Sequence, residues 1–162
     1  MKRLLIAVGL VLGLTACHSG KAKAQANLSA GANFLAANAK LPGVVTLPDG
    51  LEYKIITSGP ADGAKPQLSD EVKVHYEGKL LSGQVFDSSF ARGEPADLPL
   101  QNLIPAWVEA LQMMRPGDEW MLYVPAALGY GDQAAGPIPP DSVLVFRIRL
   151  IGVLAHPGGM AG

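Results

Sequence analysis

Two segments of alternating side chains set the tightest limit on how this chain can fold. DEVKVHYEGKLL (residues 70–81) and SVLVFRIRLIGV (residues 142–153) each place apolar and polar side chains in turn. Successive side chains of a strand point to opposite faces, so each segment offers one face to a core and the other to water. This pattern is typical of antiparallel strands, and it predicts two long strands in a half-exposed sheet.

The segments between these strands predict the rest of the fold. Residues 51–57, 84–89 and 119–125 have the composition of further strands, bounded by glycine, proline or serine turns. The one convincing helix is residues 104–114, where Pro105 suits the first turn and apolar residues recur at helical spacing. The sequence therefore predicts an α+β fold, in which an antiparallel sheet of about five strands is curled around one short helix.

The first 17 residues, MKRLLIAVGLVLGLTAC, have the pattern of a bacterial export signal. Lys2 and Arg3 precede an apolar run of 11 residues, which is short for a membrane span but suits a signal peptide. LTAC (residues 14–17) resembles a bacterial lipobox, which would make residues 1–16 a lipoprotein signal peptide and Cys17 the lipidation site. In the alternative, the signal is an ordinary secretory one and Cys17 is a free thiol. We favour lipidation because the single cysteine stands where this motif requires it.

Residues 17–46 are interpreted as a tether followed by a short helical stub. Residues 18–26 are small and polar, as in a flexible tether. Residues 27–40 are rich in alanine and predict a short helix that Gly31 weakens. The helix is either a docking or dimerisation element or a half-ordered spacer, and we favour the spacer because isolated helices of this length are marginal. The folded domain is expected over residues 47–154, followed by a disordered tail at 155–162.

Composition excludes several classes of function. Without residues 1–16 the chain keeps 11 basic and 14 acidic residues, a net charge of −3, which argues against binding nucleic acid. One cysteine excludes an internal disulfide, and three scattered histidines (His18, His75 and His156) exclude the usual zinc clusters. Only His75 lies within the predicted domain, on the polar face of its strand, so no Ser-His-Asp arrangement is available. No metal or other cofactor is therefore expected.

Four segments that follow one another along the chain indicate the function more specifically. They are VHYEGKLLSGQVFDSSFARGEP (74–95), LIPAWVEALQMMRPGDEW (103–120), GYG (129–131) and GPIPPDSVLVFRIRL (136–150). Together they resemble the signatures of FKBP-type peptidyl-prolyl isomerases, from about Leu51 to Val153. The preceding FLAANAKLPGVVTLPDGLEYKII is similar to the lead-in of the bacterial branch that carries an N-terminal helical dimerisation domain. That domain is cut to a stub here, so we expect a monomer or a weak dimer.

The resemblance implies a prolyl-binding pocket between the sheet and the helix, with Trp107 as its floor. The other substrate-binding residues would be Phe86, Leu103, Ile104, Ile138 and Phe146, and the catalytic ones Tyr76, Asp87 and Tyr130. The Tyr130 hydroxyl and the Ile104 N–H would hydrogen-bond substrate carbonyls, while Asp87 would orient Tyr76. From the residues alone, Asp87 could instead form an Asx-turn with Ser88 and Ser89.

The chain departs from the family pattern at two places. Leu98 or Ala96 stands where family members often have phenylalanine, and Ala106 where they often have glycine. We expect these differences to alter the rim of the pocket and the peptide preference more than the chemistry.

The function implied by this resemblance is cis-trans isomerisation of X-Pro bonds in envelope proteins during folding. The expected partners are proline-containing polypeptides and macrolide immunophilin inhibitors, and the expected membrane contact is the lipid anchor alone. The protein would face the periplasm, and outer-membrane placement is suggested because His18, rather than aspartate, follows Cys17. The alternatives are a proline-segment-binding chaperone or adhesin with little turnover, and a structural lipoprotein. The loop AGPIPP (135–140) is interpreted either as a mobile flap or as a simple turn.

Overall fold

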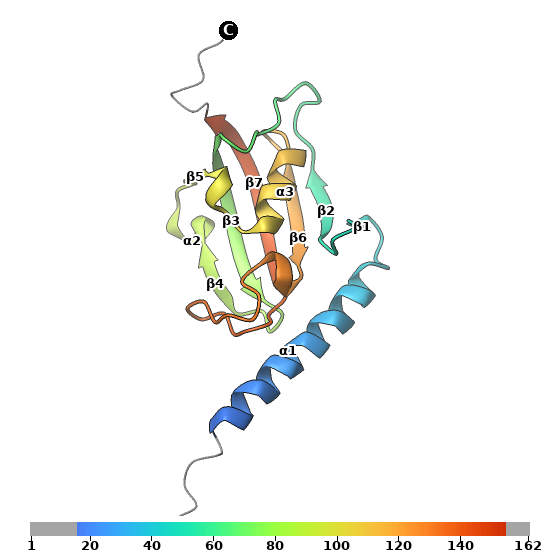
Figure 1. Ribbon diagram of the computed structural model, residues 1–162. Coiled ribbons are helices and arrows are strands. Elements are labelled where there is room, and N and C mark those ends of the chain that lie inside the picture. Colours follow the sequence, from blue (N-terminus) through green and yellow to red (C-terminus); the bar gives the residue numbers. More distant parts are fainter. Residues whose placement is uncertain (1–15, 155–162) are drawn as a thin grey trace, which may run out of the picture.

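The computed structural model describes residues 16–154, in which seven strands form one antiparallel sheet (Figure 1). The strands are β1 (Val44–Thr46), β2 (Glu52–Thr57), β3 (Glu71–Leu80), β4 (Val85–Ser88), β5 (Ala96–Pro99), β6 (Glu119–Val124) and β7 (Leu144–Leu154). Their order is β1-β2-β6-β7-β3-β4, and β5 pairs with the first half of β3. The two long strands, β3 and β7, pair along nearly their whole length at the centre.

Helix α3 (Pro105–Met113) lies across one face of this sheet and builds the core with it (Figure 1). Proline stands in its first turn, where a missing N–H costs no hydrogen bond. Its buried face consists of Ala106, Trp107, Ala110 and Leu111. The sheet contributes the facing apolar residues, among them Val72, Val74, Leu122, Leu144, Phe146 and Ile148. Because Ala106 and Ala110 have small side chains, the helix backbone can lie close to the strands.

The predicted α+β fold is confirmed, with two strands more than the five expected. The five expected strands correspond to β2, β3, β4, β6 and β7, and the expected helix to α3. Strands β1 and β5 have only three and four residues, too few for an alternating pattern to be recognised. A one-turn helix, α2 (Ser89–Arg92), and two short 3-10 turns (Leu100–Asn102 and Ala126–Leu128) were also not expected.

The N-terminal region differs most from the prediction. Helix α1 (Ala16–Asn38) runs for 23 residues and includes both the expected tether (18–26) and most of the expected stub. These residues form one continuous helix instead of a flexible tether and a separate stub, and α1 contacts the domain: the ring centroids of Phe34 and Tyr123 are 5.9 Å apart. Near its C-terminal end, buried Asn38 donates a hydrogen bond of 2.7 Å to buried Glu52.

The outer boundaries of the predicted domains are only partly described. The signal peptide (1–16) and the tail (155–162) lie outside the described residues, except for Ala16, which begins α1. Strand β1 falls within the segment 17–46 but pairs with β2, so the sheet begins before residue 47. Within residues 16–154, no helix combines the length and the hydrophobicity that a membrane span requires.

A buried carboxylate ties β6 to β7 on the face of the sheet opposite α3. Glu119 is 4% exposed and accepts hydrogen bonds from Arg147 Nε (2.6 Å) and Arg149 Nε (2.7 Å). The pairing with Glu119 explains why the solvent-exposed face of β7 carries two arginines. Burial works to raise the pKa of Glu119, but the two guanidinium groups outweigh it and hold the pKa below its ordinary value of 4.5.

We predict that Glu119→Gln lowers the free energy of unfolding at pH 7 by about 1–2 kcal/mol, because two charge-assisted hydrogen bonds lose their anion. The folded-state pKa lies below the unfolded one, so this stabilisation exists above about pH 4.5 and is lost as the pH falls through the folded value. Urea unfolding at pH 7 and pH 3 should therefore show a gap between wild type and variant that closes in acid. A gap of equal size at both pH values would contradict the assignment.

Candidate active site

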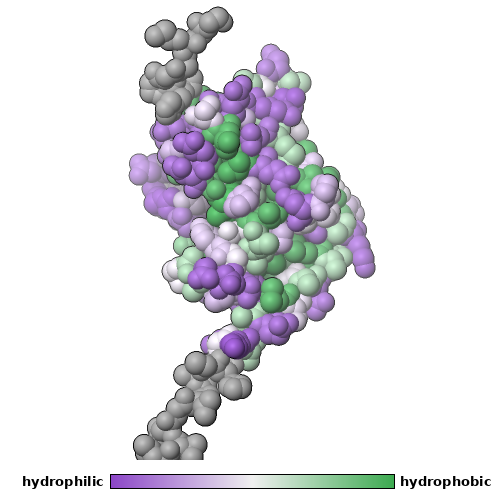
Figure 2. Space-filling model, in the orientation of Figure 1, coloured by the Kyte–Doolittle hydropathy of each residue, from purple (hydrophilic) through white to green (hydrophobic). Residues whose placement is uncertain are grey.

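A pocket of about 300 Å³ opens between α3, the strands β3, β4 and β7, and the loop that follows β6. Its lining residues are Tyr76, Phe86, Asp87, Leu98, Asn102, Leu103, Ile104, Trp107, Tyr130 and Phe146. Eight of these ten side chains are aromatic or aliphatic, and the two exceptions are Asp87 and Asn102. On the face that carries α3, hydrophobic surface is bordered by hydrophilic side chains (Figure 2). The pocket is therefore suited to an apolar group flanked by polar ones.

The indole of Trp107 connects the walls of this pocket. It is 5% exposed and makes edge-to-face contacts with Tyr76 (ring centroids 5.2 Å, 79°) and Phe146 (5.2 Å, 84°). Phe86 stands edge-on to Phe146 at 5.7 Å. Such pairs are worth about 0.5–1.5 kcal/mol each beyond the area that they bury. The four rings therefore form one rigid aromatic surface.

Gly78 in β3 makes this aromatic arrangement possible. A Cβ atom at this position would lie 2.6 Å from Phe86 Cζ and 2.7 Å from Phe146 Cε1. Any side chain here would separate the two rings, so the residue at 78 must be glycine for the wall to close. Gly78 could not be recognised from the sequence, because a glycine inside a strand does not show which side chains pack over it.

Three polar side chains at the rim hold one another. The Tyr76 hydroxyl donates to Asp87 Oδ2 at 2.5 Å, and Arg92 pairs with Asp87 Oδ1 and donates to the Tyr76 oxygen at 3.0 Å. The Ser88 hydroxyl caps α2 by accepting a hydrogen bond from the Ala91 N–H. The Asp87 carboxylate is therefore not needed as the cap and can bind Tyr76 and Arg92. The Asx-turn alternative for Asp87 is thus not needed to explain this turn.

The protonation states in this network follow from its contacts. Burial, followed by the hydrogen bond to Asp87, raises the pKa of Tyr76 above its ordinary value of 10.0. Burial also works to raise the pKa of Asp87, but the hydrogen bonds from Tyr76 and Arg92 outweigh it and lower that pKa below 3.8. Near neutral pH, Tyr76 is a neutral donor and Asp87 an anion.

The two hydrogen-bond donors that the resemblance assigns to substrate carbonyls have no acceptor in the described part of the chain, and neither has the buried Nε1–H of Trp107. Ile104 caps the N-terminus of α3, and its carbonyl accepts from Trp107 and Val108, but its N–H makes none of the hydrogen bonds found. The hydroxyl of Tyr130, a residue that is 42% exposed, likewise makes none. Both donors are available to carbonyl groups of a bound peptide.

The structure brings together eight of the nine pocket residues expected from the sequence. They are Tyr76, Phe86, Asp87, Leu103, Ile104, Trp107, Tyr130 and Phe146. Ile138 does not line the pocket; it is 5% exposed and packs in the core cluster that includes Trp107. Leu98 lines the pocket, and Ala106 is fully buried in α3. Cys17 lies apart from the pocket, in the first turn of α1.

Sequence reasoning missed two residues at the rim, Arg92 and Asn102. Arg92 reaches Asp87 because α2 makes a single turn that ends at Gly93, whose φ is +81°. The sequence shows only that Arg92 follows Asp87 by five residues. It did not predict the one-turn helix α2, which brings the two side chains together. Asn102 lines the pocket from the 3-10 turn before α3.

Comparison with known proteins supports the same assignment. Residues 63–151 match the family described as FKBP-type peptidyl-prolyl cis-trans isomerase, and residues 14–55 match the domain amino-terminal to it. The chain is 51% identical over 121 residues to the peptidyl-prolyl cis-trans isomerase Mip of Coxiella burnetii, covering 74% of this chain. It is 49% identical over 132 residues to the outer membrane protein MIP of Legionella longbeachae, covering 81% of this chain. The chain spans about half the length of these relatives, 52% and 56% respectively.

A solved structure gives the same result for the fold. The crystal structure of FkpA from Escherichia coli superposes with a TM-score of 0.83 at 37% identity, covering 88% of this chain and 66% of that one. The matched family covers more than half of the 162 residues and contains every strand from β3 to β6. The chain belongs to the FKBP-type peptidyl-prolyl cis-trans isomerase family.

Proposed function

We propose that this protein accelerates the cis-trans isomerisation of X-Pro bonds in polypeptides of the cell envelope. The observation that carries the proposal is the aromatic pocket on Trp107 with two free donors, the Ile104 N–H and the Tyr130 hydroxyl, beside it. A proline ring fits an apolar pocket of about 300 Å³, while the peptide carbonyls on either side need donors.

The barrier to this reaction comes from amide resonance, about 18–20 kcal/mol, and water bonded to the carbonyl strengthens that resonance. Both X-Pro isomers are close in energy, yet they exchange in tens to hundreds of seconds. A dry aromatic pocket removes the water and favours the twisted, less polar amide over either planar form. The rate enhancement then needs no covalent intermediate and no proton transfer.

Each polar residue has a separate part in this proposal. Tyr130 and the Ile104 N–H hold carbonyls of the peptide while the prolyl bond rotates. Asp87 and Arg92 fix the Tyr76 ring, which also packs on Trp107. The anionic Asp87 lends polarity near the rotating amide.

We predict that Tyr130→Phe lowers kcat/KM about fivefold, the effect of one neutral hydrogen bond. The measurement is cis-to-trans exchange of a Leu-Pro peptide, with and without a macrolide immunophilin inhibitor, which should abolish the acceleration. Tyr123→Phe is the matched control, because Tyr123 contacts Phe34 and lies outside the pocket. Wild-type rates in Tyr130→Phe would contradict its role. A folded wild type that accelerates nothing would favour the alternative, a proline-segment-binding chaperone or adhesin.

We predict that kcat/KM stays constant between about pH 5 and pH 9, because neither Tyr76 nor Asp87 changes protonation there. Since the pKa of Asp87 lies below 3.8, activity should fall only as the pH drops below about 4 and the carboxylate takes up a proton. Asp87→Asn has no carboxylate to titrate, so its lower activity should not fall further in that range. A transition between pH 6 and pH 8 would show that a group other than Tyr76 and Asp87 controls the rate.

For location, we propose that residues 1–16 are a signal peptide and that Cys17 carries a lipid that anchors the protein facing the periplasm. A similar protein of Legionella longbeachae is named as an outer membrane protein, which supports placement there. Cys17 lies in the first turn of α1, ten residues before Asn27, where the helix contacts the domain, and ten helical residues span about 15 Å. The anchor would therefore stand about that far from the domain, leaving the pocket accessible to envelope polypeptides. We propose a monomer or weak dimer.

We predict that Cys17→Ser, in the full chain expressed in a Gram-negative bacterium, moves the protein out of the membrane fraction. The acyl chains of the anchor are its only proposed membrane attachment, at about 0.8 kcal/mol for each buried CH₂. Ser19→Ala is the control and should stay in the membrane, and mass spectrometry of the N-terminal peptide should detect the lipid. Membrane association that survives Cys17→Ser would contradict the proposal.

A further inference from the structure

The loop between β6 and β7 is held in shape by its own hydrogen bonds. We call residues 135–142 the proline loop. Ala135 and Ile138 exchange two backbone hydrogen bonds of 3.0 Å, and the Ser142 hydroxyl donates to the Pro139 carbonyl at 2.8 Å. These bonds turn Ile138 inward, where it is 5% exposed and belongs to the cluster that contains Trp107 and Phe146. The proline loop is thus a closed turn that places one apolar side chain, Ile138, in the core cluster that includes Trp107.

Helix α1 contacts this loop from outside the domain. Asn27 Nδ2 donates to the Pro140 carbonyl oxygen at 2.8 Å, across 113 residues of sequence. One turn further along, buried Gly31 faces Val143, and a Cβ atom at Gly31 would lie 2.6 Å from Val143 Cγ2. The glycine that weakens the helix in the sequence is what lets α1 come this close. Within residues 16–154, the Asn27 bond is the one hydrogen bond between α1 and the proline loop.

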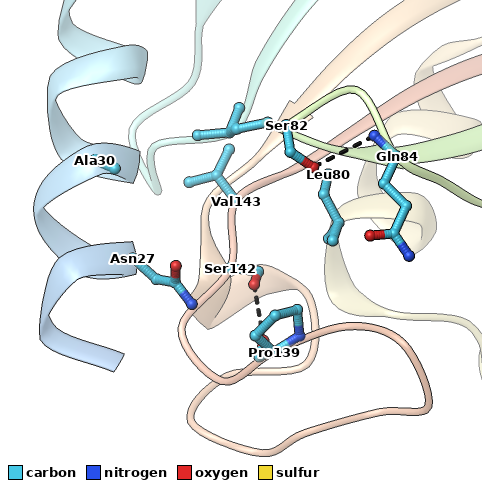
Figure 3. A pocket seen from close by; sticks show the side chains of 9 residues that line it. Asn27, Ala30, Leu80, Ser82, Gln84, Pro139, Ser142 and Val143 are labelled. Atoms are coloured by element: carbon cyan, nitrogen blue, oxygen red, sulfur yellow. Dashed lines mark hydrogen bonds between the residues drawn. The ribbon is translucent and has the colours of Figure 1, made fainter. Parts of the chain in front are cut away.

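Beside this contact, the side of the loop that faces α1 is open to solvent. Figure 3 shows an open groove between α1, the turn after β3 and the proline loop, with Asn27 pointing from the helix toward the loop. The groove measures about 320 Å³, and Leu80, Gln84, Pro139 and Val143 are among its lining residues. No close-packed side chains fill this space, so α1 reaches this region through Asn27 and through the contact between Gly31 and Val143, while Asp141 N–H ties the other end of the loop to the Gly131 carbonyl at 2.8 Å.

We propose that Asn27 is a positioning residue for the prolyl pocket. By holding the Pro140 carbonyl, it keeps Ile138 packed against the cluster that contains Trp107, although it lies outside the segment that matches the isomerase family (63–151). The proposal rests on the proposed function for its effect on substrate. Its effect on the loop itself can be measured without any activity.

The test compares three substitutions in the full chain. Asn27→Ala removes the donor, Asn27→Asp keeps the shape without an N–H, and Asn27→Gln keeps an amide donor. We expect KM for a Leu-Pro peptide to rise about fivefold in the first two variants, with kcat within about twofold, and to recover partly with Gln. Hydrogen exchange of the Ile138 and Ala135 amides should accelerate by a similar factor.

Controls separate this role from a general loss of structure. Asn33 is exposed on the same helix, so Asn33→Ala and Asn33→Asp should change neither measurement. Because alanine favours a helix more than asparagine does, a weaker helix cannot explain a loss in Asn27→Ala. Unchanged exchange at Ile138 in Asn27→Ala and Asn27→Asp would overturn the proposal, as would equal losses in all three variants. If wild type itself shows no turnover, the proposed function fails, while the exchange rates still decide whether Asn27 holds the loop.

Discussion

The fold and the pocket both depend on the packing of one indole, that of Trp107. Its ring belongs to the core formed by α3 and the sheet, and its edge-to-face contacts with Tyr76 and Phe146 also build the pocket. The same burial that stabilises the domain therefore produces a rigid apolar surface. A floor of this kind cannot adapt by small side-chain movements, because interiors are close-packed. Its shape is set before any peptide binds.

Polar groups surround this floor without entering it. Asp87, Tyr76 and Arg92 satisfy one another at the rim, whereas the Ile104 N–H and the Tyr130 hydroxyl have no acceptor in the described part of the chain. The first group stabilises the site, and the second is left for a ligand. This division suits a reaction in which the protein only has to desolvate and hold a peptide. It is also compatible with the proposed isomerase activity in a domain that has a single histidine, His75.

The sequence alone was sufficient to predict those elements whose own residues carry a recognisable pattern. The alternation in β3 and β7 predicted the sheet, and four ordered motifs predicted eight of the pocket residues. It was insufficient where a contact joins distant segments. Gly78 and Arg92 matter only because of the rings and carboxylate that fold against them, and α1 is stable through contacts such as Phe34 with Tyr123. Ile138 was predicted in the pocket, but the turn of the proline loop buries it beside the pocket instead.

In the proposed mechanism the pocket rotates an amide without moving a proton, and a solvent isotope effect would reveal any proton transfer. The measurement is kcat/KM for one Leu-Pro peptide in H₂O and in D₂O, corrected for viscosity. Since no O–H or N–H bond breaks in the proposed transition state, the ratio should be about 1. A ratio of about 2 or more would show a proton in transfer at the rate-limiting step and would contradict the account.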